Sequence, residues 1–374
     1  MGPGGSRAGR EQPASSGSRQ NRAIARAESR PIVVAAGLVA PRVGWAMNGL
    51  GLYWTDDGGA RWRMITPPDV SSMGDAVARI GDIVYANPKH VWLVAEDIRG
   101  SESIAAAPRH SALERSTDGG RTWRSVRLPG CAGCAGVHLS VLRSAGRGFA
   151  IASTQRRSRL YATDDDAATW KLVADVPVAG PLVFTSRSNG WADARGGRAL
   201  YRTVDGGRTW QRVKLEPPAA FAGAPMTLGV PRAFGSRRGL VPARFRARGA
   251  KAQHVVVFVT EDGGESWVAR PTPASANVGA QTWGFPEALP FSAASPTDWI
   301  LFVGSALYVT HDAGRTWSVF HPRNVPRAPL VWDVGFVSPS SGWAVFGYRR
   351  STSPRLVETE DGGMTWRPLT VVLR

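Results

Sequence analysis

An eight-residue stretch that ends in tryptophan occurs seven times along the chain. Ser or Thr opens each copy, Asp stands two positions later, and Trp closes it, as in Thr203-Val204-Asp205-Gly206-Gly207-Arg208-Thr209-Trp210. The closing tryptophans are 61, 47, 40, 57, 50 and 49 residues apart. A repeat of this length is typical of solenoids, propellers and repeat arrays. The sequence therefore predicts seven similar units joined end to end.

Each copy has the chemistry of a tight turn between two strands. An Asp side chain accepts hydrogen bonds from nearby backbone N–H groups, and Gly adopts positive φ without steric cost. Short alternating apolar runs lie on both sides of the turn, which predicts a β-hairpin. The closing indole offers a large apolar surface to a neighbouring unit. The turn-forming aspartates are Asp57, Asp118, Asp165, Asp205, Asp262, Asp312 and Asp361.

This pattern resembles the Asp-box, or bacterial neuraminidase (BNR), repeat of the sialidase-like β-propellers. That family includes sialidases, sortilin-type receptors, some glucan hydrolases and photosystem II assembly and stability factors. The resemblance spans residues 32–370 and implies that the box stabilises a turn and is not an active site. A second strand that opens with Gly-Trp, as at Gly44, Gly190 and Gly342, is most similar to the assembly-factor branch.

Four short strands can be found in each unit, and Gly and Pro separate them. The prediction is an all-β fold, a seven-bladed β-propeller of four-stranded antiparallel blades over residues 31–374. Residues 1–30 hold six Arg and two Glu among Gly, Ser, Pro and Gln, and we expect a disordered basic tail there. The two segments are the only domains that we predict.

No apolar run reaches the 18 residues that would indicate a transmembrane helix. The apolar run at residues 31–40 follows a basic stretch, as a signal-peptide core would, but no small-residue cleavage site comes after it. We expect this run to be the first strand of the first unit. The chain thus carries no clear export signal, although the family resemblance favours an extracytoplasmic or cell-surface location.

The two cysteines, Cys131 and Cys134, have only His138 as a further ligand-type residue nearby, and a structural zinc site needs four ligands. Haem attachment would need a histidine at position 135, where Ala135 stands. The pair is expected to form a small disulfide staple if the protein is exported, or two free thiols if it is not. We expect no metal site and no cofactor.

The net charge of +17, of which the first 30 residues supply +4, points to an anionic partner. If the strands of a blade are called a to d from the axis outward, the Asp turns are c–d turns. Loops b–c and d–a then lie on the opposite face, and the b–c loops sum to about +10. Their predicted binding residues are Arg156, Arg157, Arg159, Arg195, Arg198, Arg244, Arg246, Arg248, Lys251, Arg349, Arg350 and Arg355.

The expected partner is a protein or an anionic glycan, and the chain is expected to be a monomer. Nucleic acid fits less well, because exposed aromatic residues are not interleaved with these basic residues. The alternative is a generic basic surface, since the Asp turns carry arginines on the other face, at positions 61, 121, 208 and 315.

A non-catalytic binding or assembly scaffold is the predicted function, and we name no catalytic residue. The alternative is a sialidase-like glycoside hydrolase or a glycan-binding protein. Glycoside hydrolysis needs two carboxyl groups about 5–9.5 Å apart, and the sequence offers no such pair. The carboxylates outside the turns, expected to be solvated or turn residues, include Asp97, Asp193, Glu287 and Asp333.

Overall fold

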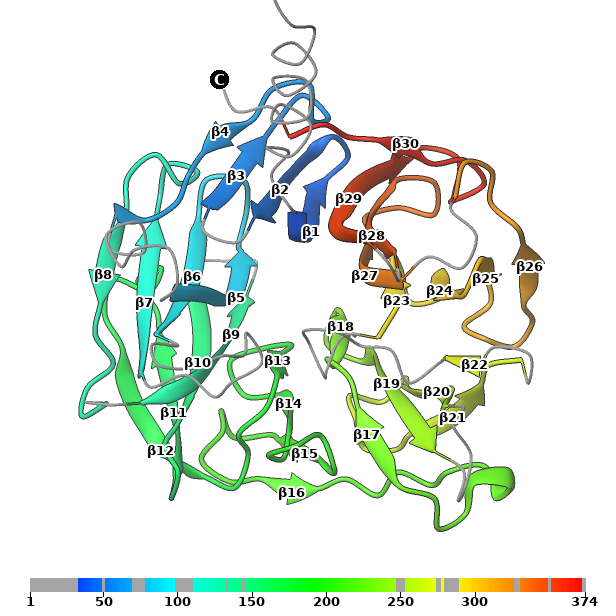
Figure 1. Cartoon of the computed structure of the whole chain (residues 1–374). Coiled ribbons are helices and arrows are strands. Elements are labelled where there is room, and N and C mark those ends of the chain that lie inside the picture. Colours follow the sequence, from blue (N-terminus) through cyan, green and yellow to red (C-terminus); the bar gives the residue numbers. More distant parts are fainter. Residues whose placement is uncertain are drawn as a thin grey trace, which may run out of the picture.

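The structure is a computed structural model of the 374-residue chain. It describes residues 33–48, 51–68, 78–97, 110–131, 134–142, 146–246, 253–273, 277–278, 289–325, 330–348 and 351–371. Seven antiparallel sheets surround a central axis (Figure 1), which confirms the predicted all-β, seven-bladed propeller. The basic segment 1–30 lies outside the described residues.

Each of the first four blades is one run of four consecutive strands, ordered from the axis outward. Blade 1 holds β1 (Val33–Ala40), β2 (Val43–Asn48), β3 (Gly51–Thr55) and β4 (Arg63–Met64). Blade 2 holds β5 (Ala78–Tyr85), β6 (Val91–Asp97), β7 (His110–Ser116) and β8 (Arg124–Val126). Blade 3 holds β9 (Ala135–Leu142), β10 (Arg147–Ser153), β11 (Ser158–Thr163) and β12 (Lys171–Val176). Blade 4 holds β13 (Leu182–Phe184), β14 (Gly190–Asp193), β15 (Leu200–Thr203) and β16 (Gln211–Arg212).

The last three blades follow the same order, after a short 3-10 helix, η1 (Ala219–Phe221). Blade 5 holds β17 (Met226–Leu228), β18 (Arg232–Phe234), β19 (Arg238–Arg246), β20 (Gln253–Thr260), β21 (Val268–Pro271) and β22 (Asn277–Val278). Blade 6 holds β23 (Phe291–Ala293), β24 (Trp299–Val303), β25 (Ala306–Thr310) and β26 (Ser318–Phe320). Blade 7 holds β27 (Leu330–Phe336), β28 (Gly342–Tyr348), β29 (Ser351–Thr359) and β30 (Arg367–Pro368).

Blade 5 departs from the four-strand pattern. Its inner strand is broken into β17 and β18, and β22 adds a short pairing to β20. The break falls at Gly229, Val230 and Pro231, where proline has no N–H to give to the strand ladder. The interruption turns Arg232 toward the axis of the ring, where it lines a cavity.

The seven Asp turns share one hydrogen-bond pattern. In each, the opening Ser or Thr hydroxyl donates to the Asp carboxylate at 2.8–2.9 Å. That hydroxyl oxygen accepts the backbone N–H four residues later. The residue after the Asp donates its N–H to a carbonyl of the a–b turn in the same blade, as Gly206 does to Ser188 at 2.8 Å. The c–d and a–b turns therefore share one face, and the b–c and d–a loops share the other.

Replacing Asp205 with alanine is expected to lower the free energy of unfolding by about 2 kcal/mol, because three donor groups lose their acceptor. Asp205 accepts bonds from the Thr203 hydroxyl at 2.9 Å and from the Thr209 N–H and hydroxyl at 3.0 and 2.6 Å. Asp57→Ala is the matched control, because Arg61 replaces the second Thr of that turn and gives only its N–H. We expect the control to cost about 1 kcal/mol less in urea unfolding. Equal losses would contradict this account.

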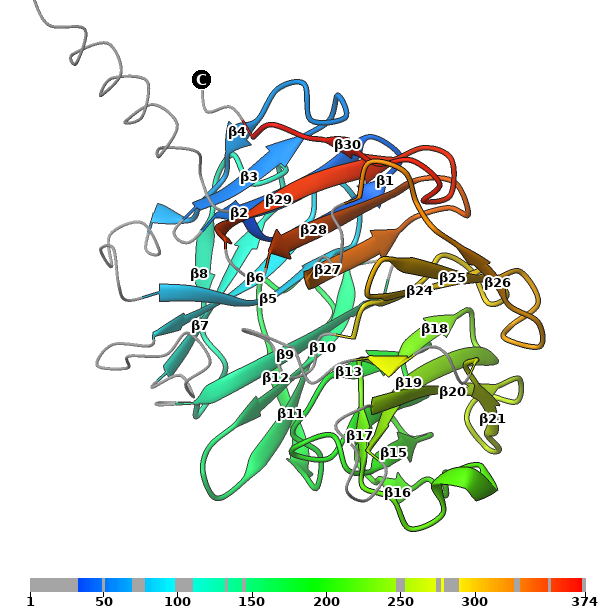
Figure 2. The ribbon, with the colours of Figure 1, turned by 45° about the vertical axis from the view of Figure 1, so that its right-hand side comes forward.

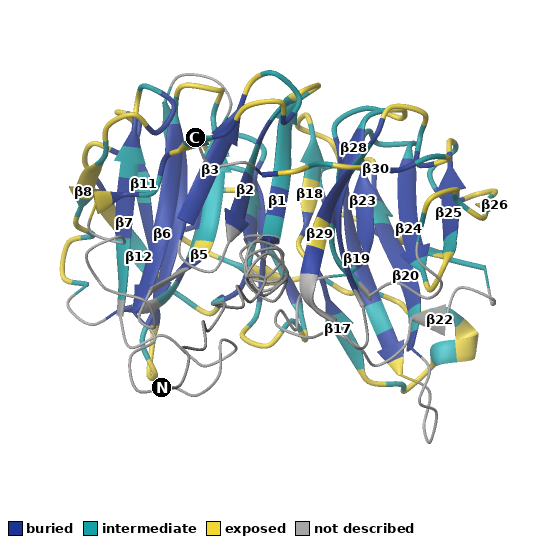
Figure 3. Cartoon of the chain, turned by 45° about the horizontal axis from the view of Figure 1, so that its top comes forward, coloured by how far each residue is buried: buried dark blue, intermediate teal, exposed yellow. Residues whose placement is uncertain are grey.

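The core consists of seven hydrophobic clusters, one at each interface between neighbouring blades. Buried positions follow the strands, and exposed positions gather at the turns and outer edges (Figure 3). Each closing tryptophan packs toward the preceding blade, as the sequence predicted for an indole at this place. Four are buried (Trp62, Trp170, Trp267 and Trp366), and three are half-buried (Trp123, Trp210 and Trp317).

The glycines near the start of the second strands have a packing reason. The indoles of Trp92 and Trp191 lie against glycines of the next blade, Gly148 and Gly239. A Cβ on either glycine would overlap the ring. The glycine of one blade thus makes room for the tryptophan of the blade before it.

The ring closes by packing between blade 7 and blade 1, without an exchanged strand (Figure 2). Side chains of inner strands also bind the backbone of the next inner strand. Ser140 Oγ accepts the Phe184 N–H at 2.9 Å, and Ser292 Oγ accepts the Phe336 N–H at 2.9 Å. At the closure, the Asp333 carboxylate accepts the N–H of Ala36. This bond joins residues near the two ends of the chain.

Candidate functional site

Two adjacent b–c loops, in blades 3 and 4, expose four of the predicted arginines. Arg156 and Arg157 lie between β10 and β11, and Arg195 and Arg198 lie between β14 and β15. All four are exposed. Arg195 Nη2 donates to the carbonyl of Thr154 at 2.8 Å and so joins the two loops. We call these four residues the arginine rim.

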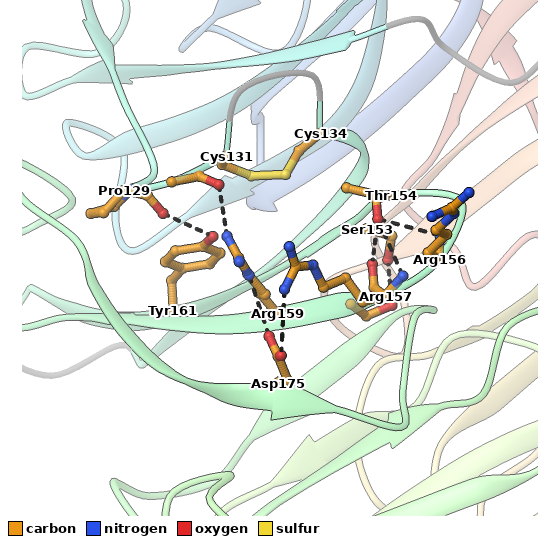
Figure 4. Close-up of a disulfide and its surroundings, with 12 residues drawn as sticks. Pro129, Cys131, Cys134, Ser153, Thr154, Arg156, Arg157, Arg159, Tyr161 and Asp175 are labelled. Atoms are coloured by element: carbon orange, nitrogen blue, oxygen red, sulfur yellow. Dashed lines mark hydrogen bonds and ion pairs between the residues drawn. A yellow bond between two sulfur atoms is a disulfide. The ribbon is translucent and has the colours of Figure 1, made fainter.

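Arg159 was predicted in the same loop, but it lies on β11 and its guanidinium is held by the fold. It donates to the Gly130 carbonyl at 2.7 Å and to Asp175 Oδ1 at 3.3 Å (Figure 4). Arg157 Nη1 is 3.9 Å from Asp175 Oδ2. Asp175 therefore neutralises part of the positive charge of Arg157 and Arg159. Arg159 holds the loop in place and has few donors left for a partner.

The loop assignment is also wrong for Arg244, Arg246 and Arg355. Arg244 and Arg246 lie on β19, which pairs with β20 as far as Arg246 and Gln253, and Arg355 lies on β29. The extra length of these units extends the strands instead of the loops between them. Arg246 and Arg355 are exposed and Arg244 is half-buried. The remaining predicted residues, Arg248, Lys251, Arg349 and Arg350, lie outside the described residues.

A disulfide beside the rim links Cys131 to Cys134, with the Cα atoms 5.3 Å apart. It lies in the d–a loop between β8 and β9. The same loop supplies the Pro129 carbonyl, which accepts the Tyr161 hydroxyl at 3.1 Å (Figure 4). The staple thus fixes the loop that receives Arg159 and Tyr161.

The turn aspartates are occupied by their own turns. Although partial burial opposes the shift, hydrogen bonds from Thr209 and Thr203 lower the pKa of Asp205 to about 2. The same balance lowers the pKa of Asp118 and Asp262 to about 2, and the N–H of Thr316 leads the lowering of the Asp312 pKa to about 2. Such carboxylates stay ionised and fully engaged near neutral pH.

A cavity of about 340 Å³ lies on the propeller axis. Inner strands of blades 1, 2, 5, 6 and 7 line it, with Trp45 and Met47 of β2. Arg232, Asp82 and Asp333 are its charged lining residues. Burial raises the pKa of Asp333 to about 6, against the opposing effect of N–H groups from Ala36 and Val334.

The carboxylates outside the turns differ from the expectation that they are solvated. Asp97 and Asp193 are 3% and 1% exposed, and Asp333 is half-buried beside the axial cavity. Glu287 lies outside the described residues. Within the described part of the chain, no cluster of three or more metal-ligating side chains is found. Those same residues include no helix long and apolar enough to span a bilayer.

Sequence reasoning missed Arg232 and a buried cluster around Asp166. His90 Nδ1 is 2.5 Å from Asp166 Oδ2, Trp92 Nε1 donates to Oδ1 at 3.2 Å, and Arg115 Nη2 is 3.2 Å from Oδ2. The sequence does hold a local signal for the Asp166 cluster, because the third turn reads Asp-Ala where most turns read Gly-Gly. The signal for Arg232 is the Gly-Val-Pro sequence directly before it, which interrupts the inner strand.

No protein-family model matches the chain, and no curated protein matches it by sequence. Solved structures do match its fold. YCF48 from Cyanidioschyzon merolae is 14% identical with a TM-score of 0.54, covering 89% of this chain and 96% of that chain. A structure of YCF48 bound to D1 peptide is 17% identical with a TM-score of 0.50, covering 78% and 81%. The GH74 enzyme of Niastella koreensis is 13% identical with a TM-score of 0.56, covering 91% of this chain and 66% of the enzyme. At these identities the likeness shows the propeller fold that binding and glycan-active proteins share.

Proposed function

We propose that this chain is a non-catalytic scaffold that binds an acidic segment of a partner protein on its b–c and d–a face. The arginine rim carries the proposal: four exposed guanidinium groups lie on two loops joined by a hydrogen bond. Guanidinium groups pair with carboxylates through two parallel hydrogen bonds, which gives orientation as well as affinity. The Asp-box assignment and the domain limits, 1–30 and 31–374, are part of the same proposal.

Two further observations support this role. A structure of YCF48 with a similar fold holds a D1 peptide, so a propeller of this kind can serve as a peptide-binding scaffold. The disulfide beside the rim fits an oxidising compartment, in keeping with the extracytoplasmic location that the family resemblance implies.

The test is a triple reversal, Arg156→Glu, Arg157→Glu and Arg198→Glu, which leaves Arg195 to hold the two loops together. Binding of a fluorescein-labelled decapeptide rich in Asp and Glu is measured by anisotropy at two salt concentrations. We expect an affinity loss of about 30-fold or more, since three close charge contacts are lost and reversed. Binding by the unchanged protein should weaken as salt rises.

The control reverses Arg121, Arg208 and Arg315, three exposed arginines on the Asp-turn face, and so changes the net charge equally. It should bind the peptide as the unchanged protein does. Equal losses in both variants would show a generic basic surface and sink the proposal. Turnover of a fluorogenic sialoside or glucan, lost on replacing one carboxylate, would favour the glycoside-hydrolase alternative instead.

A further inference from the structure

The axial cavity has the composition of a small-molecule site. Its volume of about 340 Å³ lies at the lower end of the range of about 300–1,000 Å³ for ligand pockets. Val230 is 47% exposed although it lines the cavity, so apolar surface there is left uncovered. The other large apolar walls are Trp45, Ile80, Ile83, Phe291 and Trp332.

Two opposite charges face this cavity without meeting. Arg232 comes from β18 and Asp333 from β27, and each shifts the titration of the other. Across the described residues, no ion pair within 4.0 Å joins them. Arg232 is solvent-exposed where it lines the cavity, so a ligand can reach its guanidinium. An anionic group of a ligand would form charge-assisted hydrogen bonds with it.

The remaining charges decide which ligand fits. Asp82 also lines the cavity and gives Oδ2 to the Leu139 N–H at 2.9 Å, and the buried Glu96 lies behind Gly81. An anion alone would meet Arg232 but would also lie beside the Asp333 carboxylate. A cation alone would meet Asp333 but also Arg232. A ligand that carries both charges satisfies both sides.

We propose that the axial cavity binds a small zwitterion with an apolar body, of the chemical class of an apolar or aromatic free amino acid. Its carboxylate pairs with the Arg232 guanidinium, and its ammonium group pairs with the Asp333 carboxylate, which has lone pairs beyond those that bind Ala36 and Val334. Its side chain packs on Trp45, Trp332 and Phe291. This site is independent of the arginine rim.

The test compares three probes by isothermal titration calorimetry at pH 7.5: L-phenylalanine, 3-phenylpropionate and 2-phenylethylamine. We expect L-phenylalanine to bind at least tenfold more tightly than either analogue, since each analogue makes only one of the two charge contacts. Arg232→Met should remove the advantage over 2-phenylethylamine, and Asp333→Asn the advantage over 3-phenylpropionate. Arg238→Met, an exposed arginine at the start of β19, is the matched control and should change nothing.

Protonation of Asp333 gives a second readout. Its pKa is raised to about 6 by burial, so it is ionised above that pH and neutral below it. Asp82 and Arg232 are the other charged groups lining the cavity, and the Arg232 guanidinium stays protonated over this range. The affinity for L-phenylalanine should therefore fall as pH drops from 7.5 to 5, and Asp333→Asn should flatten the profile.

Val230→Phe fills the cavity without changing a charge and should abolish binding of all three probes. This variant tests the cavity without altering a charged residue. The thermal unfolding midpoint of every variant shows whether that variant is folded. Equal affinities for the three probes, or no binding of L-phenylalanine by the folded unchanged protein, would overturn the proposal.

Discussion

Replacing Trp366 with alanine is expected to lower the free energy of unfolding by about 3–5 kcal/mol, the usual cost of emptying a large aromatic site. Trp366 is 1% exposed. Its ring lies 6.1, 6.0 and 5.4 Å from the rings of Phe302, Phe336 and Phe346. Its indole N–H donates to the Gly363 carbonyl at 3.0 Å. The substitution opens a cavity between blades 6 and 7, next to the closure of the ring.

Trp210→Ala is the matched control for this prediction. Trp210 holds the same position in the blade 4 turn, and its indole N–H donates to the Gly207 carbonyl at 3.0 Å. It is half-buried, with one aromatic neighbour, Phe184, at 6.1 Å. Urea unfolding should show a loss of about 1–2 kcal/mol for the control, in the range of ordinary substitutions. Similar losses in both variants would mean that burial against the preceding blade is not what the closing tryptophan contributes.

The difference between these two tryptophans marks the limit of what the sequence predicts. The seven turns were predictable because each is a local structure whose donors and acceptors lie within eight residues. The number of blades followed from counting them. The burial of each tryptophan depends on residues far away in the sequence, in the neighbouring blade, as Trp170 depends on Trp92 and Trp62 on Trp343. The repeat pattern does not specify these partners.

The candidate sites follow the same division. Arg156, Arg157, Arg195 and Arg198 were placed correctly on b–c loops because short loops between clear strands leave little choice. Arg244, Arg246 and Arg355 were misplaced, because the length of an insertion does not distinguish an extended strand from a longer loop. The axial cavity could not be predicted from the sequence, since Arg232 and Asp333 are 101 positions apart and line one cavity only when the ring closes.

The cluster around Asp166 leads to the second large effect. Asp166→Ala is expected to lower the free energy of unfolding by about 3 kcal/mol, because removing one partner of a buried ion pair leaves the other uncompensated. Arg115 is 17% exposed and would lose its ion pair with this carboxylate. Trp92 is 1% exposed, and its indole N–H would lose its acceptor. His90, at 35% exposure, can turn to water.

The backbone of Asp166 is strained, and the hydrogen bonds and the ion pair of its carboxylate offset that strain. Asp166 has φ of +58° at a turn position where five other turns have Gly, and such a conformation costs a non-glycine residue about 1–2 kcal/mol. Asp166→Gly would relieve that strain, so we expect it to be less destabilising than Asp166→Ala. The double variant Asp166→Ala with Arg115→Met removes both charges, and its loss should be clearly smaller than the sum of the single losses. Additive losses in thermal and urea unfolding would show that the two side chains act separately, and the turn would then owe its aspartate to something other than the bond between blades 2 and 3.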